Sequence, residues 1–274
     1  MTSCWHEEAD TRMVVHVLHA WESDYKAIQI RSVDTDVLVI FIGKFHQILE
    51  RYPDSNISVA LGFGKDFKIY PLNTVCEKVG LSRSRCLHLF HALTGSDTSA
   101  FVNKGKVTAW HAWDLCPELT QTFHYLCEHP FIEVDTDSLY FRTVERFTVK
   151  LYDRTCASES VNEARLEIFL RTASSLDRLP PTQDSLYQHF LRAVYQAGVW
   201  LTSGNSRCPP SPDGFGWIKD DSSSIWRPVW ITLQVVSQAC RELIKCCCKK
   251  SCAHCKCAKS SLPGTSLCKC QCKT

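Results

Sequence analysis

The last part of the chain carries a density of cysteine that an ordinary hydrophobic core cannot use. Nine of the 17 Cys lie between Cys246 and Cys272. A segment this short cannot fold around apolar side chains alone, so cross-links must organise it. The N-terminus, MTSCWHEEADTR, is polar and carries no visible secretory signal, which predicts an intracellular protein with reduced thiols. Close thiolates then favour zinc over disulfides. The alternative is a thiol-rich tail without a defined metal cluster.

The spacing of the tail cysteines gives a set of candidate Zn²⁺ ligands. These are Cys246, Cys248, Cys252, Cys255, Cys257, Cys268, Cys270 and Cys272. The segment 246–272 resembles one tesmin-type CXC repeat, a zinc-clustered DNA-binding module with interspersed lysines. It departs from that pattern at Gly264, where a further Cys is expected, and in its short closing spacing. The resemblance implies that zinc organises the tail.

Charge is distributed unevenly along the chain. The net charge of +2 combines a tail of +7, over residues 241–274, with a body of −5. A basic tail on an acidic body predicts that the tail meets a polyanion. We therefore expect DNA as the partner, and the nucleus or else the cytoplasm as the location. The tail residues expected to contact DNA are Lys249, Lys250 and Lys256.

Composition and pattern predict an α/β protein with several segments. The 274 residues are 45% hydrophobic and 22% charged, which is typical of globular proteins. The longest apolar run, 37–43, is too short to span a bilayer. The expected division is a nuclease-like core over 1–130, a helical region over 131–201, a loop or linker over 202–224, an apolar packed segment over 225–245 and the zinc-binding tail over 246–272.

Hydrophobic periodicity predicts the order of elements in the first part of the chain. Apolar positions recur at helical spacing over residues 7–22, and KAIQIRS has the pattern of a strand ending near Ser32. Further strands are expected at 56–63 and 67–71, and a helix at 74–79. This alternation predicts a parallel α/β sheet with flanking helices. From Cys86 onward the pattern becomes helical.

Three short motifs in the first hundred residues carry acidic side chains: HEEADTR, SVDTDVL and TGSDTSA. Asp34 and Asp36 directly follow the strand AIQI, at the edge of a parallel sheet where ligands gather. Glu8, Asp10 and Asp97 are expected to join them. Five converging carboxylates repel one another, and Mg²⁺ or Mn²⁺ relieves that repulsion. Paired metals of this kind serve phosphodiester hydrolysis. The alternative is that each acid only caps a helix.

The order of these motifs resembles the flap-endonuclease and XPG-like 5′ nucleases, which have a PIN-like fold. The resemblance covers about residues 6–113 and is nearest to the XPG-like proteins of animal mobile elements. It implies that Glu8, Asp10, Asp34, Asp36 and Asp97 are catalytic metal-binding acids. It also implies that a turn in the sequence TGSDTSAFVNKGKVTAW holds the DNA backbone. The residues of that turn are Asn103, Lys104, Gly105 and Lys106.

The family begins with acid-bearing strands before its EAD helix, whereas only seven residues precede Glu8 here. We therefore expect a core that lacks the first strands, and weak metal affinity. The predicted function is a metal-dependent DNA-acting protein, with a non-catalytic nucleic-acid or chromatin-binding zinc protein as the alternative. A third interpretation is a fragment of a longer gene product.

Histidines outside the tail are interpreted as core or surface imidazoles. His88 and His91 lie in the apolar segment CLHLFHAL. His16 and His19 lie in an earlier segment that is also predicted to be helical and apolar. Only His254 lies among the tail cysteines, where it has a better claim to bind metal.

Overall fold

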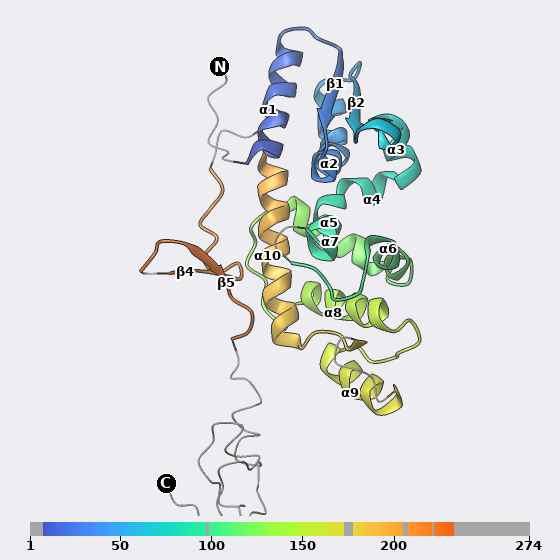
Figure 1. Cartoon of the computed structure of the whole chain (residues 1–274), viewed down its shortest axis with the longest axis vertical. Helices are drawn as coiled ribbons and strands as arrows, with labels where there is room; N and C mark the ends of the chain where they lie inside the picture. Colours follow the sequence, from blue (N-terminus) through green and yellow to red (C-terminus); the bar gives the residue numbers. More distant parts are fainter. Residues whose placement is uncertain (1–7, 97–98, 173–177, 205–207, 221, 233–274) are drawn as a thin grey trace, which may run out of the picture. The chain divides into compact units, whose positions relative to one another are not determined.

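The computed structural model describes residues 8–96, 99–172, 178–204, 208–220 and 222–232 (Figure 1). The chain divides into two compact units, Met1–Trp230 and Ile231–Thr274, and the elements described below all belong to the first. No helix within these ranges is long and apolar enough to cross a membrane.

The first unit contains a small sheet near its start, a series of helices and a short hairpin at its end. In chain order the elements are α1 (Ala9–Glu22), β1 (Ala27–Ser32), α2 (Thr35–Arg51), β2 (Asn56–Leu61), the 3₁₀ helix η1 (Gly64–Asp66), β3 (Lys68–Pro71), α3 (Leu72–Val79), α4 (Leu81–Arg85), α5 (Leu87–Thr94), α6 (Lys106–Asp114), α7 (Glu118–Glu128), α8 (Leu139–Tyr152), α9 (Val161–Thr172), α10 (Gln183–Thr202), β4 (Trp217–Lys219) and β5 (Trp226–Pro228).

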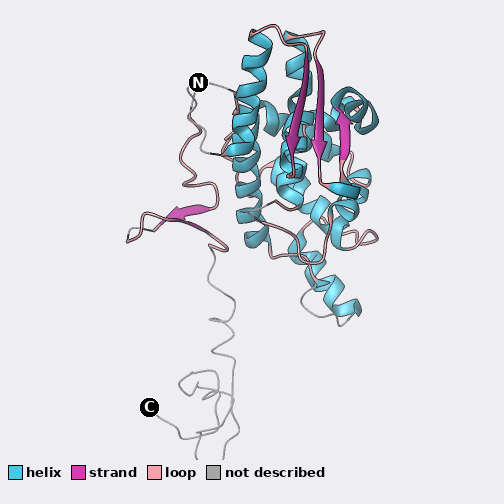
Figure 2. Ribbon diagram, turned by 45° about the horizontal axis from the view of Figure 1, so that its top comes forward, coloured by secondary structure: helices cyan, strands magenta, loops and turns pink. Residues whose placement is uncertain are grey.

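The main sheet is mixed, with strand order β1-β2-β3 (Figure 2). β1 and β2 are parallel and joined through α2, whereas β3 returns antiparallel to β2. The expected parallel sheet is therefore wrong for β3. The physical reason is the short connection through η1, because a parallel neighbour needs a crossover of a dozen or more residues. The structure is mixed α/β, with a small mixed sheet of three strands and many helices in the described part of the chain.

Alternation along the strands explains which face of the sheet is covered. Ile57, Val59 and Leu61 alternate along β2 and are buried, while Gln29 and Arg31 of β1 are exposed. The first connection is the apolar run after Asp34, which forms α2, and Val37, Ile40 and Phe41 in it are fully buried. This helix is the centre of the N-terminal half of the core.

A long helix, α10, ties the later helices to the sheet region. It packs against α5, α8, α2 and α7, and lies beside α5 and α8 in Figure 1. Phe190 and Trp200 on α10 are almost completely buried. The core is thus continuous from α1 to α10.

Two segments differ from the sequence-based expectation. The expected loop 202–224 contains β4, which pairs antiparallel with β5. The expected packed segment 225–245 is described only as far as residue 232, and there it forms β5. Residues 233–274, which include the cysteine-rich tail, lie outside the described residues.

Candidate acidic site

Four of the five predicted acids lie at the starts of two helices. Glu8 is the N-cap of α1 and Asp10 lies in its first turn, whereas Asp34 is the N-cap of α2 and Asp36 lies in its first turn. Carboxylates are stabilised there by the free backbone N–H groups and the helix dipole. The fifth acid, Asp97, lies outside the described residues.

Asp34 acts as a helix cap. Its carboxylate accepts a 2.9 Å hydrogen bond from the backbone N–H of Asp36, and its side chain is exposed. Its own backbone N–H donates to the hydroxyl of Ser32 at 3.0 Å. This is the capping role that the sequence leaves open as an alternative. The structure therefore shows a local capping role for Asp34, directed at the backbone of Asp36.

Asp36 is held by a histidine from a different helix. The Asp36 carboxylate and His91 Nε2 are 2.7 Å apart, and their side chains are only 16% and 9% exposed. His91 belongs to α5, and its ring lies tilted against the indole of Trp200 at 5.9 Å between centroids. The contact fixes the orientation of the Asp36 carboxylate at the start of α2.

Glu8 belongs to the same charge neighbourhood as Asp10 and Asp36. Burial is the largest cause that raises the pKa of the Glu8 carboxyl, and the charges of Asp10 and Asp36 raise it further. Two donors from α10 act in the opposite direction, the indole N–H of Trp200 and the side-chain amide of Gln196. The amide of Gln196 lies 3.4 Å from Glu8 Oε1. Glu8, Asp10 and Asp36, from the starts of two helices, therefore share one charge neighbourhood.

The buried indole N–H of Trp200 lies near these acids. Its side chain is 1% exposed, and its indole N–H has no hydrogen-bond partner within the described part of the chain. The group is nevertheless near enough to lower the pKa of Glu8. A buried donor of this kind is costly to leave unpaired, so an acceptor drawn into this neighbourhood would be favoured.

Carboxylate oxygens are the donors that Mg²⁺ and Mn²⁺ prefer, so the chemistry of this set suits such an ion. The geometry fits only in part. Within the ranges that the structure describes, no three His, Cys, Asp or Glu side chains form a group that could hold a metal ion. The described acids alone are therefore not a preformed metal site.

The predicted DNA-binding turn precedes α6. Asn103 adopts a left-handed conformation with φ of 57°, which Asn tolerates better than most residues, and Gly105 is the N-cap of α6. The ammonium group of Lys104 lies 4.7 Å from the ring centre of Tyr152.

Lys106, the last residue of the predicted turn, points back into the protein. Its ammonium donates to the carbonyl oxygens of His91, at 2.9 Å, and Gly95. Burial lowers the pKa of Lys106 to about 8, and the charge of Asp36 acts in the opposite direction. Lys106 thus caps the end of α5 behind the acidic site.

The lysines and cysteines of the predicted zinc tail lie outside the described residues. These are Lys249, Lys250, Lys256, Cys246, Cys248, Cys252, Cys255, Cys257, Cys268, Cys270 and Cys272.

Sequence reasoning missed three side chains around the acids: His91, Gln196 and Trp200. His91 lies 55 positions from Asp36, and Gln196 lies 188 positions from Glu8. The only local signal for His91 is a polar residue in an otherwise apolar helix, which fits a core imidazole equally well.

Comparisons with known proteins do not identify a relative. No protein-family model matches the chain, and no curated protein and no solved structure matches it either.

Proposed function

We propose that the chain is a metal-dependent, DNA-acting protein that resembles structure-specific 5′ nucleases and derives from a mobile element. The observation that supports this is the shared neighbourhood of Glu8, Asp10 and Asp36 at the starts of two helices. Burial raises the pKa of the Glu8 carboxyl most, and the charges of Asp10 and Asp36 raise it further. A Mg²⁺ or Mn²⁺ ion would neutralise that excess charge. His91 would keep the Asp36 carboxylate oriented while the amide of Gln196 donates to Glu8.

The tail completes this proposal. Its cysteines would bind Zn²⁺ and its lysines would contact DNA phosphates, which would place the protein in the nucleus. The acidic body alone carries the wrong overall charge for tight DNA binding.

A second candidate is a non-catalytic nucleic-acid-binding zinc protein that keeps only part of a nuclease site. It is favoured by the lack, among the described residues, of any three side chains arranged to hold a metal. The commitment of the Asp34 carboxylate to helix capping points the same way.

A cleavage assay separates the two candidates. The full chain is incubated with 5′-flap DNA in Mn²⁺, beside Asp36→Asn and the control Asp54→Asn, which alters an exposed acid. We expect cleavage to be very low in the wild type and the control, and lost in Asp36→Asn. No cleavage by the wild type at saturating Mn²⁺ favours the non-catalytic candidate. Equal cleavage by wild type and Asp36→Asn contradicts the acidic site.

A further inference from the structure

A cleft separate from the acids lies between the loop that precedes α6 and the helices α8, α9 and α10. It has a volume of about 420 Å³, and its described lining includes Phe101, Tyr152, Arg165, Arg192 and Trp230 but no acidic residue. Aromatic rings and guanidinium groups therefore form its walls together.

Positive charge at this cleft is not balanced by carboxylates. The ammonium group of Lys104 lies over the ring of Tyr152. Burial is the largest cause that lowers the pKa of Lys104, and the positive charge of Arg154 lowers it further. Arg165 borders the cleft and donates to the carbonyl oxygen of Pro180. No ion pair among the described residues joins Lys104, Arg154 or Arg165 to an acid.

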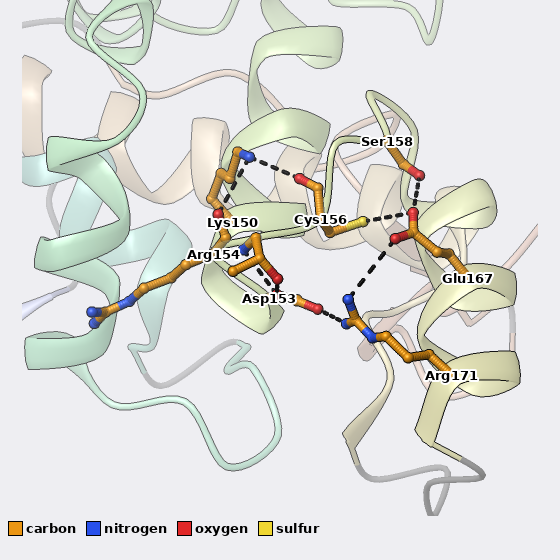
Figure 3. A network of polar contacts seen from close by, with 8 residues as sticks. Lys150, Asp153, Arg154, Cys156, Ser158, Glu167 and Arg171 are labelled. Carbon is orange, nitrogen blue, oxygen red and sulfur yellow. Dashed lines mark hydrogen bonds and ion pairs between the residues drawn. The ribbon is translucent and has the colours of Figure 1, made fainter.

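Two acids of the polar network next to Arg154 already have partners. Asp153 pairs with Arg171 and accepts from Thr155, while Glu167 accepts from Ser158 at 2.9 Å. In Figure 3, Arg154 points away from this network, whereas Arg171 points into it. The local carboxylates thus leave Arg154 available for an external anion.

Trp230 supplies a flat apolar surface at the same cleft. The guanidinium of Arg192 lies 5.1 Å from the centre of the Trp230 ring, and Trp230 is 61% exposed. Arg192 is itself fixed, since it donates to Ser99 at 3.0 Å and to the carbonyl oxygen of Val229 at 2.6 Å. The indole is therefore supported from one side and open to a ligand.

We propose that this cleft binds a nucleotide of a single-stranded nucleic acid, with the base stacked on Trp230 and neighbouring phosphates held by Lys104, Arg154 and Arg165. Unpaired cations beside an exposed aromatic surface match a chain that alternates phosphates with planar bases, and only an unpaired base can reach a ring inside a cleft. The inference rests on the proposed function in that the partner is nucleic acid, but it needs no cleavage.

Photocrosslinking tests the site directly. The full chain with zinc, and without added Mg²⁺ or Mn²⁺, is irradiated with a short oligothymidylate that carries 4-thiothymidine, and the adducts are mapped by mass spectrometry. We expect adducts at Tyr152 or Trp230, and a loss of their yield of roughly tenfold in Trp230→Ala and in Arg154→Gln/Arg165→Gln. Arg146→Gln is the matched control, because Arg146 on α8 pairs with Glu118 at 3.1 Å and Glu159 at 3.7 Å.

Several results would overturn the proposal. Adducts confined to residues 241–274, or equal yields in all variants, would show that the cleft does not bind the strand. Competition by inorganic phosphate or polyglutamate as strong as that by thymidine monophosphate would show a general anion site. Adducts at the cleft together with absent DNA cleavage would support the cleft while counting against the nuclease proposal.

Discussion

Two histidines are buried so deeply that their protonation opposes folding. Burial lowers the pKa of His189 to about 4, with the charge of Arg192 adding to the effect and the carbonyl of Leu93 opposing it. Burial also lowers the pKa of His88 to about 3, followed by the charge of Lys44. His88 packs against Gly43, where an added Cβ would lie 1.8 Å from the imidazole, so this helix contact requires glycine.

The first prediction concerns acid stability. An unfolded histidine titrates near pH 6.5, so as the pH falls the unfolded chain takes up protons before the folded chain does. The stability contribution of His189 is complete above about pH 6.5 and decreases toward pH 4, by about 2 kcal/mol at pH 5. Urea denaturation of wild type and His189→Gln at pH 7.5 and pH 5 measures this. The variant, whose amide can still donate to Leu93, should lose less stability on acidification; an identical loss contradicts the assignment.

At the scale of elements, Glu145 joins three helices. It lies on α8, is 3% exposed, and its Oε1 accepts from the backbone N–H of Val161 at 3.3 Å and from the amide of Gln183 at 3.2 Å. These two donors begin α9 and α10. Burial raises the pKa of Glu145, and the bonds from Gln183 and Val161 act against that rise.

The second prediction follows from this joint. Glu145→Ala removes the acceptor for two buried or half-buried donors and should lower the free energy of unfolding by about 2–3 kcal/mol. Glu145→Gln keeps an acceptor oxygen and should cost clearly less. Urea denaturation at pH 7.5 compares them. Equal losses in the two variants would contradict the role given to these hydrogen bonds, because Gln keeps both an acceptor oxygen and nearly the volume of Glu.

Local patterns predict elements here better than they predict contacts between elements. The strand AIQI and the capping acids of α2 are in place, because alternation and capping depend on neighbouring residues. The direction of β3 is not readable in this way, since it depends on a short connection and not on the pattern of KIYP. The contact between His91 and Asp36 is likewise set by how α5 packs against α2.

At the scale of the whole molecule, the tail and the body divide the proposed work. The body supplies the acidic neighbourhood and the cationic cleft, and the tail supplies the net positive charge, +7 against −5 for the body. Such a division predicts that zinc and the acidic site can be tested independently in one protein.

The third prediction is that the tail binds at least two Zn²⁺ ions. Eight or more close thiolates exceed the needs of one tetrahedral site. Native mass spectrometry of the full chain under reducing conditions should show at least two zinc ions per chain, and replacing the last three tail cysteines, Cys268, Cys270 and Cys272, by Ser should remove at least one. A spectrum with one zinc or none, with zinc in excess, would refute the prediction.

The acidic neighbourhood is the central claim, and Mn²⁺ binding tests it most directly. Electron paramagnetic resonance titration of the zinc-loaded full chain should show weak Mn²⁺ binding in the wild type and in the control Asp54→Asn. That binding should be lost in Asp36→Asn and in Glu8→Gln, because each removes one of the three interacting carboxylates. Mn²⁺ binding of equal strength in all four proteins would contradict the account.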